Sequence, residues 1–519
     1  MSPHALPLLA PAAFFAAAAF AFRDPGMRPR DVPLIAERAA LFAVATALVA
    51  LLALASAGPG TGPSLGAGAL ALAPRLDAVS APMLLLVSFV GWVVLRYSAN
   101  YMDGSARQGA FTGWIATTLG AVTLLVQAGT LAHFVVAWIA TSVCLHKLLL
   151  FYPERVQAQR AARKKEVTAR LGDVAMIAAA WLLADGYGTT DIAAILEAAR
   201  AGVAPAGVSW AAALLALAAL LKSAQFPFHG WLTEVMETPT PVSALLHAGV
   251  INAGGFLLIR FADVMLLAPG VLALLVMVGG FTAVFGAMVM LTQPAVKTSL
   301  AWSTVGQMGF MILQCGLALF PIALLHIVAH SLYKAHAFLT AGAAVESVAA
   351  VRRPGPVAIP DAAAVGRAFL LALGIYAGVG VLFGFEGKSA QSLALGAILI
   401  FGVAYLLAQG LADAAPRALT RKTALYAVGA SLGYFTLHLF AVRATAGALP
   451  ATPAPGPLEW ALIVLAVVSF ALVAVTQAMF PNWAYHPAAA GFRVHLSNGF
   501  YVNAAFDRLI GGWRLRARA

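Results

Sequence analysis

Three titratable side chains recur at helical spacing in one apolar segment, PIALLHIVAHSLYKAHAFL. They are His326, His330 and Lys334, at positions i, i+4 and i+8, so a helix would place them on one face. At a rise of about 1.5 Å per residue this stripe would reach roughly 12 Å. Such a stripe could pass protons by short hops through bridging water. The alternative is three polar groups that pack against neighbouring helices.

The histidine spacing in this stripe also raises the possibility of a zinc site, because His-x-x-x-His can bind zinc. In the metalloprotease motif a Glu follows the first His, but Ile327 stands there in this chain. Lys334, one turn further along, would repel a cation. The sequence therefore predicts no metal site and no cofactor.

A second group of ionisable residues follows an apolar run that ends at Lys222. Pro227 comes soon after it, and a helix broken there would open a polar pocket at membrane depth. Glu237 could reach Lys222, and a carboxylate and an amine so coupled titrate as a pair. His247 lies in the next apolar run. The alternatives are a Lys222 side chain that snorkels to an interface and a satisfied core histidine.

Two further candidates for proton transfer are Asp173 and Lys388. Asp173 closes the turn Arg170–Asp173, where the helix dipole could equally favour its charge. Lys388 follows Glu386 in a second interrupted apolar region. The two interrupted regions, Pro227–Pro241 and Gly384–Lys388, fall one in each half of the chain, which is typical of inverted-repeat transporters.

The segments that carry these residues are apolar enough to cross a membrane. Of the 519 residues 62% are hydrophobic and 10% are charged, against roughly 25% charged in a soluble domain. A span needs about 20 residues, so we expect an all-α polytopic membrane protein with about 14–16 transmembrane helices. The first apolar run lacks the features of a signal peptide and is predicted as the first span. Two cysteines exclude a disulfide framework.

The net charge of +12 is distributed between the apolar runs, which does not indicate a nucleic-acid-binding surface. Arg and Lys gather in the loops after the first, third and fifth spans, so the positive-inside rule predicts a cytoplasmic location for these loops. The N-terminus would then lie outside the cell inner membrane. Arg163, Lys164 and Lys165 belong to the largest cluster, which would be a solvated loop or a site for acidic lipid or a partner.

Longer segments of this sequence resemble the antiporter-like proton-conducting subunits shared by respiratory complex I and Mrp antiporters. They are KSAQFPFHGWLTEVMETPTPVSALLHAG, KTSLAWSTVGQMGF and HIVAHSLYKAHAFL. The resemblance implies two inverted five-helix repeats, a broken helix in each, and a central axis of Lys, His and Glu. By motif match, that axis would contain the half-channel lysine Lys222, the loop histidine His247, the stripe His326, His330 and Lys334, and the second broken-helix lysine Lys388.

This pattern divides the chain into four expected parts. They are N-terminal spans at 1–108, a proton-conducting core at 109–411, C-terminal spans at 412–480 and a tail at 481–519.

The sequence departs from that family in two places. The family has a Glu directly after a Trp in the fifth span, paired with the first lysine, but here Ile139 follows Trp138. Glu237 or His146 could substitute for it. The short segment after the last span leaves no room for the long lateral helix of the largest complex I subunit, which disfavours a complex I role.

The segment CLHKLLLFYPER at 144–155, followed by AARKK, is most similar to the membrane subunits of DAB-type inorganic carbon accumulation systems. That resemblance implies a peripheral zinc-containing partner, DabA, which resembles a carbonic anhydrase and lies on the cytoplasmic side. Proton flow would energise one-way hydration of CO2 to bicarbonate, and this chain would be a transporter subunit, not an enzyme. The alternatives are a subunit of a Mrp-type Na+/H+ antiporter or of a complex I-like NADH dehydrogenase, an intramembrane zinc enzyme that uses His326 and His330, and a structural scaffold.

Overall fold

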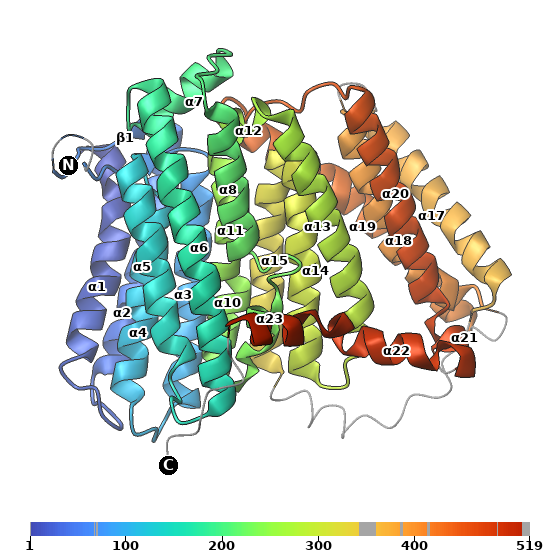
Figure 1. The fold of residues 1–519 in the computed structure, drawn as a ribbon, viewed down its shortest axis with the longest axis horizontal. Helices are drawn as coiled ribbons and strands as arrows, with labels where there is room; N and C mark the ends of the chain where they lie inside the picture. Colours follow the sequence, from blue (N-terminus) through green and yellow to red (C-terminus); the bar gives the residue numbers. More distant parts are fainter. Residues whose placement is uncertain are drawn as a thin grey trace.

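Long helices run side by side through most of the molecule (Figure 1). The computed structural model describes residues 2–66, 68, 71–341, 360–384, 388–412, 416–484 and 486–510. Within these residues, thirteen helical segments are long and apolar enough to cross a membrane, and the shorter apolar helix α8 (Val208–Lys222) lies among them. The predicted all-α polytopic fold is confirmed, whereas the inverted repeats and the four-part division stay predictions.

The elements fall into three groups along the chain. The first group holds η1 (Pro3–Leu8), α1 (Leu9–Ala21), α2 (Val32–Ala57), β1 (Gly60–Thr61), β2 (Arg75–Leu76), α3 (Ser80–Tyr101), α4 (Gln108–Val126), α5 (Leu131–Leu149), α6 (Val156–Tyr187) and α7 (Ile192–Arg200). The second holds α8, α9 (Gly230–Thr233), η3 (Val235–Glu237), α10 (Thr240–Ala248), η4 (Val250–Asn252), α11 (Ala253–Arg260), α12 (Ala262–Leu266), α13 (Pro269–Met290), α14 (Val296–Gly316) and α15 (Phe320–Thr340). The third holds α17 (Ala362–Phe383), α18 (Ala390–Gly410), α19 (Arg417–Ala444), α20 (Pro457–Ala478), α21 (Phe480–Trp483), η5 (Pro487–Ala489), α22 (Ala490–Ser497), η6 (Gly499–Tyr501) and α23 (Val502–Ile510).

The first two groups of helices share one large apolar core, which reaches from Ala10 to Phe338 with a few later side chains. Helices α17–α20 contain a second core of their own. A smaller third core joins α13 and α15 to α18 and α20. The C-terminal helices therefore form a distinct bundle that packs beside the centre of the molecule.

Two interruptions break the helices at the centre of the molecule. Helix α8 ends at Lys222, and α9 begins only at Gly230. The second interruption lies at Gly249, whose φ of −120° and ψ of −82° separate α10 from η4 and α11. Such irregular backbone is tolerated at membrane depth only where protein or a polar cavity surrounds it. The predicted break after Lys222 is confirmed.

The chain turns back after α20, and its last helices run across the upright ones (Figure 1). Helix α22 contacts α13, and α23 contacts α6 and α9. This short crossing segment ties the C-terminal bundle to the first half of the chain.

Helices α13 and α14 pack backbone against backbone at their glycines. A Cβ atom on Gly309 would lie 2.4 Å from the backbone nitrogen of Ala283. Small residues permit this close approach between membrane helices. We therefore expect Gly309→Val to destabilise the protein by about 1–3 kcal/mol, measured by thermal unfolding of the purified protein. The matched control is Gly374→Val on α17, where the space around a Cβ is open; equal stability of both variants would contradict this packing.

Candidate functional site

The first part of the candidate site surrounds the end of α8. The ammonium of Lys222 donates to Ser142 Oγ at 2.5 Å and to the Trp138 backbone oxygen at 3.4 Å. It also lies 4.3 Å from the centre of the Trp138 ring. Lys165 on α6 donates to the backbone oxygen of the same Ser142. Ile139 stands where the family's acidic partner of Lys222 was expected, and Lys222 instead contacts a serine one turn after Trp138.

Asp173 lies close to this lysine pair and is itself paired. Its carboxylate is 2.9 Å from Arg170, which also lies 2.9 Å from Glu166. His146 Nδ1 lies 3.4 Å from Glu166. Asp173 is 3% exposed, and the charges of Lys222 and Lys165 act on it, so the predicted acid lies inside the bundle near Lys222.

The basic cluster on α6 differs from its predicted surface role at two positions. Lys164 is fully buried and contacts Glu234 at 2.7 Å, Asp507 at 2.9 Å and Asn503 at 2.7 Å. Lys165 is 4% exposed. Neither side chain is available to a partner or to lipid, because contacts within the chain already engage both. Arg163 alone of the three is exposed.

Glu237, predicted as a partner for Lys222, has a side chain outside the part of the chain that the structure describes. Its neighbour Glu234 is described, and it pairs with Lys164. Sequence reasoning missed Ser142 and Glu234, and it assigned Lys165 to a partner-binding cluster and not to a place beside Lys222. The only signal for Ser142 was a small polar residue in an apolar run.

The second part of the site is the stripe on α15. Lys334 is fully buried and donates to Ser303 Oγ at 2.8 Å and to the Leu300 backbone oxygen at 3.1 Å. The ring centres of His326 and His330 lie 5.9 Å apart. The three side chains therefore follow one helix through the centre of the molecule, in the order that their spacing predicts.

His247 joins this stripe from the broken helix α10. Its backbone oxygen lies 3.1 Å from His330 Nε2, and its Nδ1 lies 3.1 Å from Thr304 Oγ1. The ring stacks on Phe338 at 4.4 Å. Among the described residues its Nε2 is buried without a hydrogen-bond partner, a condition that is uncommon in native proteins and often marks a site for water or a proton.

Val250, the residue after the helix break at Gly249, lies between the two parts of the site. Val250 lines a cavity of about 20 Å³ with Lys165 and Lys222, and a second cavity of about 20 Å³ with Asn252 and Ser331. Asn252 donates to Ser331 Oγ at 3.0 Å, next to His330 on α15. Each cavity has room for about one water molecule. Apart from Asn252 and Ser331, the second cavity is lined by apolar residues and Gly249.

Lys388 lies apart from this sequence of groups. Its ammonium donates to the Gly384 and Phe383 backbone oxygens and lies 5.4 Å from the ring of Phe435. Glu386, which precedes it in the sequence, is outside the described residues. Lys388 therefore contacts α17 and α19, and the structure brings it into no direct contact with the stripe.

A larger cavity of about 510 Å³ separates α14 and α15 from the C-terminal bundle. His326 and Gln314 line it on one side, with His326 Nδ1 2.9 Å from Gln314 Oε1. His438 and Tyr434 line it from α19. His438 was not predicted, since a lone histidine in the apolar run FTLHLF gave no pattern to follow.

A metal centre is not indicated by the described part of the chain, where no group of three His, Cys, Asp or Glu side chains could hold an ion. His326 and His330 also turn toward different partners, Gln314 and the His247 backbone.

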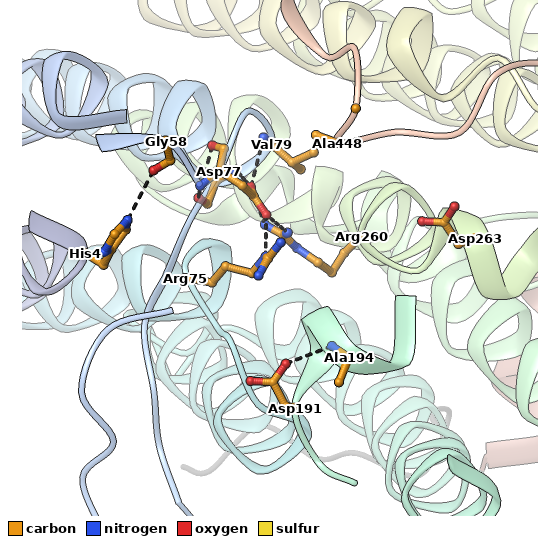
Figure 2. A network of polar contacts seen from close by, with 12 residues as sticks. His4, Gly58, Arg75, Asp77, Val79, Asp191, Ala194, Arg260, Asp263 and Ala448 are labelled. Atoms are coloured by element: carbon orange, nitrogen blue, oxygen red, sulfur yellow. Dashed lines mark hydrogen bonds and ion pairs between the residues drawn. The ribbon is translucent and has the colours of Figure 1, made fainter. Parts of the chain in front are cut away.

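A buried ion network fixes one end of the broken helix (Figure 2). Arg260, at the end of α11, contacts Asp77 at 2.5 Å, and Arg75 contacts the same carboxylate at 2.8 Å. Asp77 also accepts from the backbone N–H of Val79 and Ser80 at the start of α3. Burial alone would raise the pKa of Asp77, but Arg260 and then Arg75 outweigh it and hold this pKa below the ordinary range.

Two families match parts of this sequence. Residues 128–354 match the family described as NADH:quinone oxidoreductase/Mrp antiporter, TM. Residues 64–112 match the N-terminus of chain 5 of NADH-ubiquinone oxidoreductase (complex I). Together the matched segments contain Lys222, His247 and the α15 stripe.

Similar proteins agree with these matches. A "Probable inorganic carbon transporter subunit DabB2" from Halothiobacillus neapolitanus is 38% identical over 482 residues, which cover 91% of this chain and 85% of the relative. DabB from Hydrogenovibrio crunogenus is 47% identical over 52% of each chain. A chain in the Mrp complex from Dietzia sp. DQ12-45-1b has the same fold, with a TM-score of 0.61, 24% identity, and coverage of 98% of this chain and 60% of that one. The chain therefore belongs to the family of antiporter-like membrane subunits of complex I and Mrp antiporters, together with the DabB proteins.

Proposed function

We propose that this chain is the proton-conducting membrane subunit of an inorganic carbon accumulation system. The observation that carries the proposal is its 38% identity, over nearly its whole length, to a protein named as a probable inorganic carbon transporter subunit. The polar groups between α6 and α15 support the conducting role, because ionisable residues at membrane depth are costly and mark ion pathways.

In this proposal protons move between Lys222 and Lys334 through the helix break. Lys222 and Asp173 act in the first half, and His247, His330 and His326 act beside Lys334. Each group holds a proton and then releases it to its neighbour. Glu237 and Lys388 remain proposed members at the two ends. A charge that crosses the membrane potential yields about 2.3 kcal/mol per 100 mV, so one or two protons could drive an otherwise uphill carbon step.

The partner in this proposal is a DabA-like peripheral zinc protein on the cytoplasmic side of the inner membrane. Named relatives of this chain are subunits of larger assemblies. Proton flux through this chain would energise hydration of CO2 to bicarbonate by that partner. The N-terminus would lie outside, and Arg163 would be the exposed member of the basic cluster on the cytoplasmic side.

Purification from native membranes tests this function directly. We expect a tagged copy of the full chain to co-purify with one large peripheral protein that holds stoichiometric zinc. We also expect deletion of the gene to abolish growth at ambient CO2 and to leave growth at elevated CO2 intact. Recovery of Mrp or NADH dehydrogenase subunits instead would favour the second candidate, an antiporter or respiratory subunit, which the family match at 128–354 also supports.

A further inference from the structure

Two lysines from different helices meet at one residue of α5. Lys222 donates to the Oγ of Ser142, and Lys165 donates to its backbone oxygen. Both lysines also line the same cavity of about 20 Å³, with Thr168 and Trp231. Because one serine spans only a few Å, two ammonium groups held there would repel each other strongly in a site with little water.

The charged side chains around Lys165 and Lys222 are balanced when the two lysines together carry one positive charge. Arg170 pairs with both Glu166 and Asp173, so these three side chains together carry one net negative charge. Among the described side chains, the other titratable groups near the pair are Cys144 and His146 on α5, which carry no charge in their usual forms near neutral pH. One ammonium and one neutral amine therefore give the smallest net charge inside the bundle.

We propose that Lys165 and Lys222 share a single transferable proton across Ser142, and that this amine pair takes the place of the family's lysine and glutamate pair. The inference rests on the proposed proton-conducting function. In the transfer an N–H bond of the Lys222 ammonium breaks as its proton passes to a water in the shared cavity. A proton of that water forms the new N–H bond on the Lys165 amine, and the water is regenerated.

This arrangement differs physically from an acid and amine pair. An ion pair holds both partners charged until a proton arrives, whereas two amines exchange the proton without forming a separated charge. Lys165 would then pass the proton between Lys222 and the basic N-terminal part of α6. The competing interpretation is that Lys165 is a fixed cation that only joins α6 to the Ser142 carbonyl.

Three variants separate these interpretations. The measurement is proton flux through the full assembly in proteoliposomes with an imposed membrane potential. We expect Lys165→Met to lower proton flux at least about 10-fold, as for loss of a proton-transfer group. Lys165→Arg keeps the positive charge but does not release its proton, so it should fail equally. Lys147→Met, an exposed lysine on α5, is the matched control and should conduct as the unmodified protein does.

A pH profile gives a second readout that a structural role would not move. Without a neighbouring ammonium, the residual flux of Lys165→Met should persist to a more alkaline pH than the flux of the unmodified protein. This measurement also decides the matter if Lys165→Arg does not fold.

Two outcomes would overturn the inference. Full flux in Lys165→Met would exclude a proton-carrying role, and full flux in Lys165→Arg would show that a fixed charge suffices. The variant Lys222→Ala distinguishes failure of this inference from failure of the proposed function. If Lys222→Ala conducts normally, protons do not pass through Lys222 and the proposed function is wrong. If Lys222→Ala loses flux while the Lys165 variants conduct normally, only the sharing of a proton with Lys165 is overturned.

Discussion

Replacement of Lys334 by Ala should lower proton flux by at least about 100-fold, since positioned acid–base groups contribute 10²–10⁴-fold to proton transfer. Lys334 is fully buried in the C-terminal half of α15. Its amine is the group that can take a proton from the His330 side, and the neighbouring Ser303 and Leu300 oxygens cannot replace it as a base. The measurement is proton uptake into proteoliposomes that contain the complete assembly.

The control for Lys334→Ala is His336→Ala, two residues further along the same helix. His336 is exposed and lies off the stripe, so its loss should leave flux unchanged. Membrane insertion of Lys334→Ala should also be normal, because removal of a buried cation lowers the cost of insertion. Normal flux in a well-inserted Lys334→Ala protein would show that protons do not pass through this stripe.

Local patterns in the sequence were sufficient to predict the stripe. His326, His330 and Lys334 share one face because helix periodicity depends only on neighbours in the chain. The break after Lys222 was also predictable, since proline and a polar stretch interrupt an apolar run there. These features need no knowledge of which helices touch.

The partners of the first lysine could not be predicted in the same way. Ser142 meets Lys222 across 80 residues of sequence, and no periodicity connects them. The basic cluster was expected in a loop, but α6 begins at Val156 and continues for 32 residues, so Lys164 and Lys165 lie on a helix and turn inward. Asp507, which neutralises Lys164, comes from the far end of the chain.

Asp77→Asn should produce the largest loss of stability. Arg260 is 3% exposed, so the substitution leaves a buried guanidinium without its main counter-charge, which costs about 3–5 kcal/mol. The upper half of the broken helix, α11, would lose its anchor to the start of α3. Thermal unfolding of the purified protein measures the effect, and proton flux should fall with it because α11 and η4 follow directly on the helix break at Gly249.

Acid should weaken the same anchor in the unmodified protein. The folded-state pKa of Asp77 is lowered, so its contribution is complete above the ordinary aspartate pKa of about 3.9. That contribution decreases as pH falls below this value, and Asp77→Asn should remove this part of the pH dependence.

The matched control for Asp77→Asn is Asp103→Asn. Asp103 pairs with Arg28 at 3.2 Å, but both side chains are more than half exposed, and such surface pairs contribute only about 0–1 kcal/mol. Equal stability losses in the two variants would show that burial of Asp77 and Arg260 adds nothing. A large loss in Asp77→Asn alone, reduced when Arg260→Met is added, would assign the loss to the unpaired guanidinium, since double-variant cycles isolate the pairwise energy.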